Sequence, residues 1–310
     1  MLARLFTKSA RFSSGYWLRL AVFTVIVLTI ALGGLLVYYV NLQIKVFVTP
    51  HRNRNIGSPL EVSSTYEDVV LTTTDGLKIS GWYMPGSRPQ AIILVHGVDA
   101  NRAALLPEAR LLAEAGYHLL MIDLRGHGWS EGELATYGYW EALDVQAAVD
   151  YLLTLPEIEQ VGALGTSYGG AAVVRAAAAD PRIKVIVIES SYSSLPAAID
   201  DAFEDLSIFP KWPFAPLLVR IAERRVGLKI DAVDSARDLA TFQSRPVLII
   251  HGTDDRLFPL YHAQKMYAAA QMPKELWIIE GLGHQNPVIG REEEYKERVA
   301  GFFQMAFERQ

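Results

Sequence analysis

The stretch VGALGTSYGG at residues 161–170 decides the fold of this 310-residue chain. Its first four residues are short and apolar, like a buried strand, and the pattern Gly-x-Ser-x-Gly follows around Ser167. Residues 171–179 are mostly strong helix formers. A strand, a sharp turn and a helix are the context in which this pattern presents a serine nucleophile at the apex of a strained turn. The alternative is a glycine-rich turn with an incidental serine, so the partners of Ser167 must decide.

Apolar runs and helical runs alternate through the rest of the chain from residue 66 onward. A hairpin is predicted where two β-rich runs, 69–73 and 77–83, flank Thr74-Asp75-Gly76. Six further apolar runs have the length of buried strands: 91–95, 118–122, 161–164, 183–188, 246–250 and 275–279. Helical segments separate them at 103–115, 139–153, 171–179 and 262–271, and 292–307 closes the chain. The pattern predicts an α/β fold with a mostly parallel sheet of about eight strands and helices on both faces.

One connection is too long for this alternation. More than fifty residues separate the strand ending near Ile188 from the strand at 246, and such a connection is functional or an inserted subdomain. We expect a small helical cap over the site at about 191–233. Its proline-broken apolar segment at 208–216 could line a pocket for an apolar substrate or touch a membrane, and ordinary packing onto the body is the alternative.

The first sixty residues contain no acidic residue, and residues 20–40 carry no charge at all. As a helix, 21 such residues span about 32 Å, close to the hydrocarbon core of a bilayer. Trp17, Tyr38 and Tyr39 could lie at the two interfaces. We expect a basic segment at 1–19, a transmembrane helix at 20–40, a linker at 41–65 and the folded domain at 66–310. A cleavable signal peptide usually has a shorter apolar stretch, and a buried core helix would be amphipathic.

Charge sets the expected orientation and partners. Four basic residues precede the apolar stretch and three follow it, which predicts a cytoplasmic N-terminus and a folded domain outside, by a margin of one. Residues 61–310 carry 22 basic and 34 acidic residues, a net charge of −12 that offers no footprint for nucleic acid. The chain has no cysteine, which excludes disulfides, thiolate catalysis and cysteine-ligated zinc.

A serine nucleophile needs a histidine base and an orienting acid. In this kind of sheet the three follow the order serine, acid, histidine along the chain and lie after strands. Only His262 and His284 come late enough, and His262 begins a helix, whereas His284 lies in a loop directly after a strand. His284 is therefore the predicted base. The preceding strand-to-helix loop supplies two adjacent aspartates, Asp254 and Asp255, and the residues alone do not choose between them.

Four motifs in order carry a family resemblance. They are His96-Gly97 after a strand, Asp123-Leu124-Arg125-Gly126-His127-Gly128-Trp129-Ser130, the turn at Ser167, and H-G-x-x-D-x-x-x-P at 251–259 followed by G-x-G-H at 281–284. The chain from about Glu67 resembles the α/β-hydrolase superfamily, closest to its serine-aminopeptidase and monoacylglycerol-lipase-like branch. The resemblance implies that Asp255 is the acid and that the 123–130 loop is structural. It also implies an oxyanion hole formed by the backbone N–H groups of Tyr168 and Val98.

The resemblance and the residues together predict a membrane-anchored serine hydrolase that cleaves an ester, with a lipid-like acyl substrate as the first expectation. Such chemistry needs no metal and no organic cofactor. The alternative within enzymes is a peptidase or amidase, because Glu189, Asp200, Asp201, Glu204 and Asp205 could bind a free amino terminus. A non-catalytic membrane-tethered interaction module is a third hypothesis, and the set Ser167, Asp255 and His284 argues against it.

Overall fold

The computed structural model describes residues 14–54, 57–206, 211–284 and 286–309. The chain divides into two compact units, Met1–Val46 and Phe47–Gln310, and each is described by itself.

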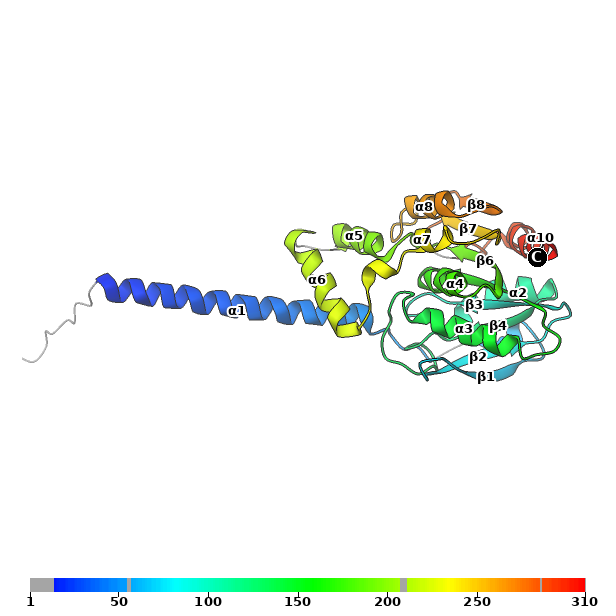
Figure 1. Cartoon of the computed structure of the whole chain (residues 1–310), viewed down its shortest axis with the longest axis horizontal. Helices are drawn as coiled ribbons and strands as arrows, with labels where there is room; N and C mark the ends of the chain where they lie inside the picture. Colours follow the sequence, from blue (N-terminus) through cyan, green and yellow to red (C-terminus); the bar gives the residue numbers. More distant parts are fainter. Residues whose placement is uncertain (1–13, 55–56, 207–210, 285, 310) are drawn as a thin grey trace, which may run out of the picture. The chain divides into compact units, whose positions relative to one another are not determined.

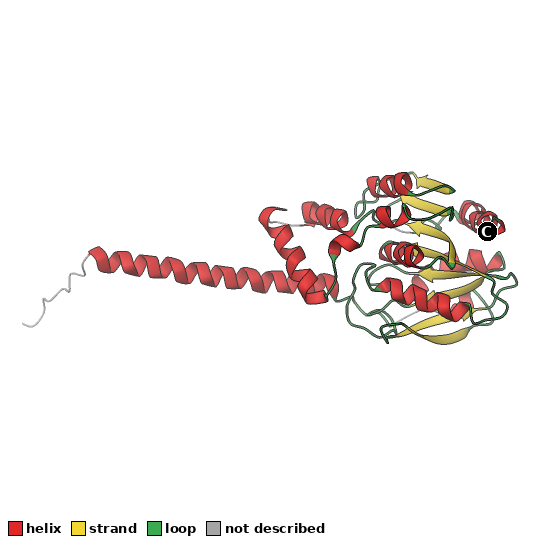
Figure 2. Ribbon diagram, in the orientation of Figure 1, coloured by secondary structure: helices red, strands yellow, loops and turns green. Residues whose placement is uncertain are grey.

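The second unit is built on one eight-stranded sheet with the strand order β1-β2-β4-β3-β5-β6-β7-β8. Strands β1 (Glu67–Thr72) and β2 (Lys78–Met84) form the predicted antiparallel hairpin, and β2 also pairs antiparallel with β4 (His118–Ile122). All the other pairs are parallel, and they join β3 (Gln90–Val95), β5 (Gln160–Thr166), β6 (Ile183–Glu189), β7 (Val247–Gly252) and β8 (Lys274–Ile279). The mostly parallel eight-stranded sheet expected from the sequence is confirmed (Figure 2).

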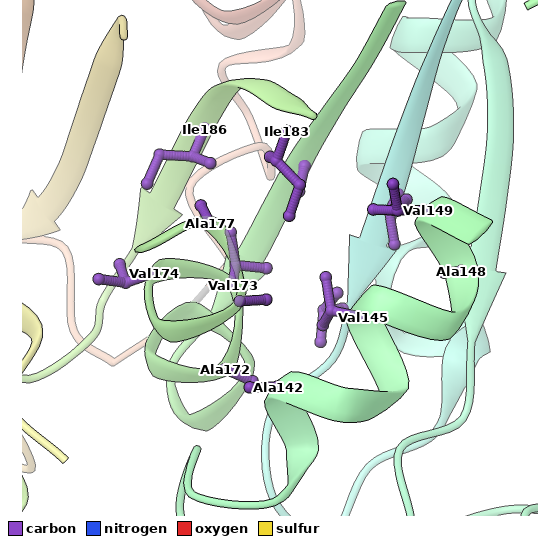
Figure 3. Close-up of a cluster of buried hydrophobic side chains, with 14 of the residues drawn as sticks. Ala142, Val145, Ala148, Val149, Ala172, Val173, Val174, Ala177, Ile183 and Ile186 are labelled. Carbon is purple, nitrogen blue, oxygen red and sulfur yellow. The ribbon is translucent and has the colours of Figure 1, made fainter. Parts of the chain in front are cut away.

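Helices cover both faces of this sheet (Figure 1). Helices α3 (Glu141–Leu152), α4 (Tyr168–Ala179) and α8 (Tyr261–Ala269) contribute to one buried core, part of which Figure 3 shows around Val145, Val173 and Ile186. Helices α2 (Leu106–Glu114), α9 (Glu292–Tyr295) and α10 (Gly301–Glu308) contribute to the other, and the π-helical turn Lys296–Ala300 joins α9 to α10. Consecutive residues of a strand belong to opposite cores, as Ile92 and Ile93 of β3 do. This is why the strands read as continuous apolar runs.

The long connection between β6 and β7 holds three helices, α5 (Leu195–Leu206), α6 (Lys211–Val226) and α7 (Ser235–Leu239). The first two fall within the cap expected at 191–233, and they extend away from the sheet in Figure 1. They pack on a third core cluster that includes Tyr192, Leu195, Leu228, Ile230 and Phe258. Residues 208–210 of the proline-broken segment lie outside the described residues.

Helix α1 (Ser14–Val48) forms most of the first unit. It has 35 residues, and its portion Ser14–Lys45 is long and apolar enough to cross a membrane by length and composition. The helix extends past both ends of the expected span, 20–40, so residues 41–48 of the expected linker are helical. Three of the flanking basic residues, Arg4, Lys8 and Arg11, lie outside the described residues.

Candidate active site

Ser167 occupies the single residue between β5 and α4. Its backbone has φ 54° and ψ −121°, a conformation that side-chain-bearing residues rarely adopt and that persists only where the surroundings enforce it. The enforcing contacts are backbone hydrogen bonds: the Ser167 N–H donates to Glu189 O at 2.7 Å, and the Gly170 N–H donates to Ser167 O at 3.0 Å. The predicted strand, sharp turn and helix are all present.

The two glycines of the Gly-x-Ser-x-Gly pattern are required by close backbone approach. A Cβ on Gly165 would lie 2.4 Å from Gly169 O, and a Cβ on Gly169 would lie 2.4 Å from both Val95 O and His96 O. Because backbone atoms cannot yield, any larger residue would force the turn apart. The same contacts bring the end of β3, and with it the His96-Gly97-Val98 loop, against the first turn of α4.

Three side chains from distant parts of the chain meet at this turn. His284 Nε2 lies 3.0 Å from Ser167 Oγ, and His284 Nδ1 lies 2.9 Å from Asp255 Oδ2. The carboxylate accepts at Nδ1, so Nδ1 carries the hydrogen and Nε2 is left to accept from the serine hydroxyl. Ser167 and the Asp255 carboxylate are buried, while one fifth of the imidazole is exposed. The structure thus brings together the three predicted residues in the predicted order.

The choice between the two aspartates is made by the β7–α8 loop. Asp255 Oδ1 accepts from the backbone N–H groups of Leu257 and Phe258, at 3.0 and 2.9 Å, which turns Oδ2 toward His284. Asp254 is exposed, and its carboxylate accepts only from the Thr253 hydroxyl among the described contacts, at 3.1 Å. Adjacent loop residues point in different directions, and the aspartate that faces His284 is the one that the family resemblance implied.

Two further residues at this loop were not predicted. The Phe258 ring meets His284 edge to face with 5.2 Å between ring centroids. His251 Nε2 donates to Phe258 O at 2.7 Å and lies 3.5 Å from Asp255 Oδ2, and burial lowers the pKa of this imidazole. Both contacts hold the loop in place around the acid. The H-G-x-x-D pattern contained the signal for His251, but its role as a loop support needs the folded geometry.

The remaining histidines near the turn are structural. His96 Nδ1 donates to Gly97 O, its Nε2 accepts from the Leu124 N–H, and burial beside His127 lowers its pKa to about 3. His127 Nε2 accepts from the Asp99 N–H, which ties the 123–130 loop to the loop after β3. The N–H groups of Val98 and Tyr168 donate no backbone hydrogen bond within the described chain. Both are therefore free of backbone acceptors, which an oxyanion hole requires of its donors.

Two acids of α3, Glu141 and Asp144, are fully buried and have structural partners. Asp144 pairs with Arg125 of the 123–130 loop at 2.8 Å, and burial raises its pKa to about 7 despite that partner. Glu141 accepts from the backbone N–H groups of Thr136 and Gly138 and from the Thr136 hydroxyl. Polar residues at helical spacing usually lie on a solvated face. These two carboxylates are buried instead, because each has hydrogen-bond donors within the fold.

Glu189, one of the acids that could have bound a free amino terminus, is fully buried. Its Oε1 accepts from the buried hydroxyl of Tyr295, and no basic group of the described chain pairs with it. The second carboxyl oxygen has no hydrogen-bond partner there, nor does Oε2 of the buried Glu108. Burial, and then the charge of Glu108, raise the pKa of Glu189 well above its ordinary value. Glu189 and Glu108 are therefore two interacting buried carboxyl groups, and the backbone of Glu189 supports Ser167.

Three acids of cap helix α5, Asp200, Asp201 and Glu204, have partners as well. Asp201 Oδ2 accepts from the Tyr261 hydroxyl at 2.5 Å and from His262 Nε2 at 2.7 Å. His262 Nδ1 accepts in turn from the Ser193 N–H and lies 2.9 Å from its hydroxyl. Asp200 and Glu204 both lie within salt-bridge distance of Lys211. Within the described residues no group of three or more His, Asp or Glu side chains could hold a metal ion.

Residues 48–203 match the family described as X-Pro dipeptidyl-peptidase (S15 family). Among curated proteins, the chain is 29% identical over 260 residues to the protein YfhR of Salmonella typhi, covering 77% of this chain and 82% of YfhR. It is 30% identical over 228 residues to a protein of Mycobacterium tuberculosis, and the match covers 72% of this chain and 73% of that protein. Among solved structures, an esterase of Pyrococcus furiosus matches with a TM-score of 0.71 and 27% identity, covering 84% of this chain and 98% of the esterase.

A mostly parallel eight-stranded sheet with a serine at a strained strand-to-helix turn defines the α/β-hydrolase superfamily, as the sequence motifs predicted. Its members with this turn are serine hydrolases, and so is this protein. Within the superfamily, the chain belongs to the S15 peptidase family.

Proposed function

We propose that the protein is a membrane-anchored esterase whose catalytic triad is Ser167, His284 and Asp255. The observation that carries the proposal is the pair of contacts at His284, 3.0 Å to the serine hydroxyl and 2.9 Å to the aspartate. These are the distances at which a histidine base takes a proton from a nucleophile.

In the proposed acylation step, Ser167 Oγ attacks the ester carbonyl carbon while its proton moves to His284 Nε2. Asp255 keeps Nδ1 protonated and stabilises the imidazolium that forms. The tetrahedral oxyanion accepts hydrogen bonds from the Tyr168 and Val98 N–H groups, and the helix dipole of α4 favours its charge. Collapse of this intermediate breaks the bond to the alcohol, which leaves with the proton from Nε2, and the acyl group stays on Oγ.

Deacylation repeats the sequence with water. His284 Nε2 takes a proton from the water as its oxygen attacks the acyl carbon. The second tetrahedral intermediate then expels Ser167 Oγ, which recovers the proton from Nε2, and the carboxylic acid product leaves. Loss of one oxyanion donor in such a site typically lowers turnover by about 10²–10³.

An ester substrate is favoured over a peptide because four of the five acids that could bind a free amino terminus have other partners; the side chain of the fifth, Asp205, lies outside the described part of the structure. Asp201 is engaged by His262 and Tyr261, and Asp200 and Glu204 by Lys211. Glu189 is buried against Tyr295. The match to the S15 family keeps a peptidase as the second candidate, and the likeness to the Pyrococcus furiosus esterase supports the first.

We further propose that α1 is an uncleaved membrane anchor with a cytoplasmic N-terminus, which leaves the hydrolase domain outside. Its apolar portion is long enough to cross a bilayer, and four basic residues precede residues 20–40 while three follow. An enzyme held at a membrane meets lipid-like acyl esters at high local concentration, which supports that substrate class.

A fluorophosphonate probe tests the triad, and a substrate panel tests the ester assignment. The probe is expected to label the native protein and not Ser167→Ala; equal labelling of both would refute Ser167 as the nucleophile. p-Nitrophenyl esters of increasing acyl length are compared with X-Pro and aminoacyl nitroanilides. Faster hydrolysis of the nitroanilides would assign a peptidase instead of an esterase.

A further inference from the structure

The cap helix α6 has two unlike faces. Ala215, Val219, Ala222 and Val226 follow helical spacing and turn inward; Ala215 is buried, and the other three pack on the third core cluster. Leu217, Arg220 and Arg224 lie on the opposite side and are exposed. Neither arginine pairs with a carboxylate of the described chain. The outward face thus combines an exposed apolar residue with two cations that have no ionic partner there.

Trp212 adds to the exposed apolar surface of this helix. Its backbone is not helical, with φ −101° and ψ 132°, and its side chain is 80% exposed. It is the most exposed of the large hydrophobic side chains of the described chain. Tryptophan beside arginine and lysine is typical of helices that lie in the interface between lipid headgroups and water.

The charge of α6 differs from that of the body around it. Residues 211–226 hold four basic residues and one acid, Glu223, which accepts from the Ile230 N–H. Residues 61–310 have a net charge of −12. Of the acids of neighbouring α5, Asp200 and Glu204 lie beside Lys211, and Asp201 faces α8. The two exposed cations Arg220 and Arg224 therefore make the outward side of α6 locally basic.

Chain length limits how far the start of the folded domain can be from a bilayer. Residues 41–46 separate the expected span, 20–40, from Phe47, where the folded domain begins. As helix they cover about 9 Å. The Tyr137 hydroxyl donates to Phe47 O at 2.7 Å, and the Ala135 N–H donates to Val48 O, so the chain is tied to the domain from its first residues. With residues 20–40 as the span, this short tether keeps Phe47, the start of the domain, near the headgroups.

We propose that the outward face of α6, with Trp212, Leu217, Arg220 and Arg224, docks on an anionic membrane surface. This inference rests on the proposed anchoring by α1 and adds the second contact that fixes how the domain faces the lipid. The inward face packs on the cluster that contains Phe258, and Phe258 contacts His284. Docking of α6 would therefore act on the residues packed around His284 as well as on the orientation of the domain.

The absence of cysteine makes the test direct. The full chain carrying Leu217→Cys is labelled with a nitrobenzoxadiazole dye and reconstituted in vesicles of phosphatidylcholine, with or without 30% phosphatidylglycerol. A second protein is labelled at Gln304→Cys, exposed on α10, which lies at the other end of the domain from α6 (Figure 1). Nitroxide-labelled lipid is expected to quench position 217 in the anionic vesicles, less so in the neutral ones, and to leave position 304 unquenched.

Charge reversal separates the proposal from simple tethering. Arg220→Glu/Arg224→Glu is expected to lower the ratio of docked to undocked α6 by at least roughly 25-fold, because each basic residue lost near an anionic surface removes about a fivefold factor and the added carboxylates are repelled. Arg110→Glu/Arg309→Glu, at exposed positions elsewhere on the domain, makes the same charge change and should leave the quenching as it was. Hydrolysis of a soluble p-nitrophenyl ester reports whether each variant is folded.

The two proposals fail in different ways. Vesicle flotation reports the anchor, and quenching at position 217 reports α6. A protein that floats with the vesicles but shows no quenching, or equal quenching in both charge variants, overturns docking and leaves the anchor standing. A protein that does not float overturns the anchor and the docking together.

Discussion

At the scale of single residues, Asp254 and Asp255 are a natural matched pair. In Asp255→Asn the amide oxygen can still accept from Leu257 and Phe258, but the side chain no longer holds the His284 tautomer. We expect turnover of a p-nitrophenyl ester to fall by roughly 10⁴, the loss typical of this change in a serine triad. Asp254→Asn, on an exposed side chain, should stay within about twofold of wild type. Similar losses in the two variants would contradict the assignment of Asp255.

The buried carboxyl pair predicts a pH dependence of stability. Burial raises the pKa of Glu108 from 4.5 to about 7, so between those values the folded chain binds more protons than the unfolded chain. The stabilisation is complete below about pH 4.5 and is lost as the pH rises through 7. Glu108→Gln, which carries no charge, should therefore raise the Tm by several degrees at pH 8 and by much less at pH 5.

Thermal unfolding at the two pH values checks this expectation. Glu114→Gln is the control, since Glu114 lies on the same helix and is exposed beside Lys296. Its Tm difference from wild type should be small at both pH values. A Glu108→Gln effect of the same size at pH 5 and pH 8 would show that Glu108 is ionised throughout.

At the scale of elements, Asp201 joins cap helix α5 to α8. Asp201→Ala leaves the Tyr261 hydroxyl and His262 Nε2 without their acceptor, and His262 is fully buried. Unsatisfied buried donors cost about 1–3 kcal/mol each, so we expect a loss of about 2–3 kcal/mol and faster proteolysis within the cap. Asp200→Ala removes only an exposed pair with Lys211 and should cost less than about 0.5 kcal/mol. Denaturant unfolding compares the free energies of the two variants. Equal losses of stability would show that Asp201 does not hold the cap to α8.

The elements also show what sequence patterns carry. Strands and helices were predictable because a sheet buried on both faces needs continuous apolar runs. The turn at Ser167 was predictable because only glycine fits at positions 165 and 169. The burial of Glu141, Asp144 and Glu189 was not predictable. Sequence patterns treat a polar residue as exposed and carry no information about a hydrogen-bond donor from another element. Residue types alone did not choose between Asp254 and Asp255; the family motif indicated Asp255, and two backbone N–H groups orient its carboxylate.

At the scale of the whole molecule, we expect the distribution of charge around the apolar helix to set which side of a membrane the hydrolase domain occupies. Four basic residues precede residues 20–40 and three follow, a margin of one. We expect a C-terminal alkaline phosphatase fusion, which is active only outside the cytoplasm, to be active, and the protein to keep its full length. A shorter product beginning after residue 40 would show a cleaved signal peptide.

So narrow a margin predicts that the orientation can be changed. Replacing Arg4, Lys8 and Arg11 by alanine leaves one basic residue before the span against three after it, and phosphatase activity should fall as chains insert the other way round. Replacing Lys184, Lys229 and Lys265 removes the same charge far from the span and should leave topology unchanged, since distant charges in a folded domain contribute little. Unaltered activity in the first variant would mean that the folded domain, and not the flanking charge, sets the orientation.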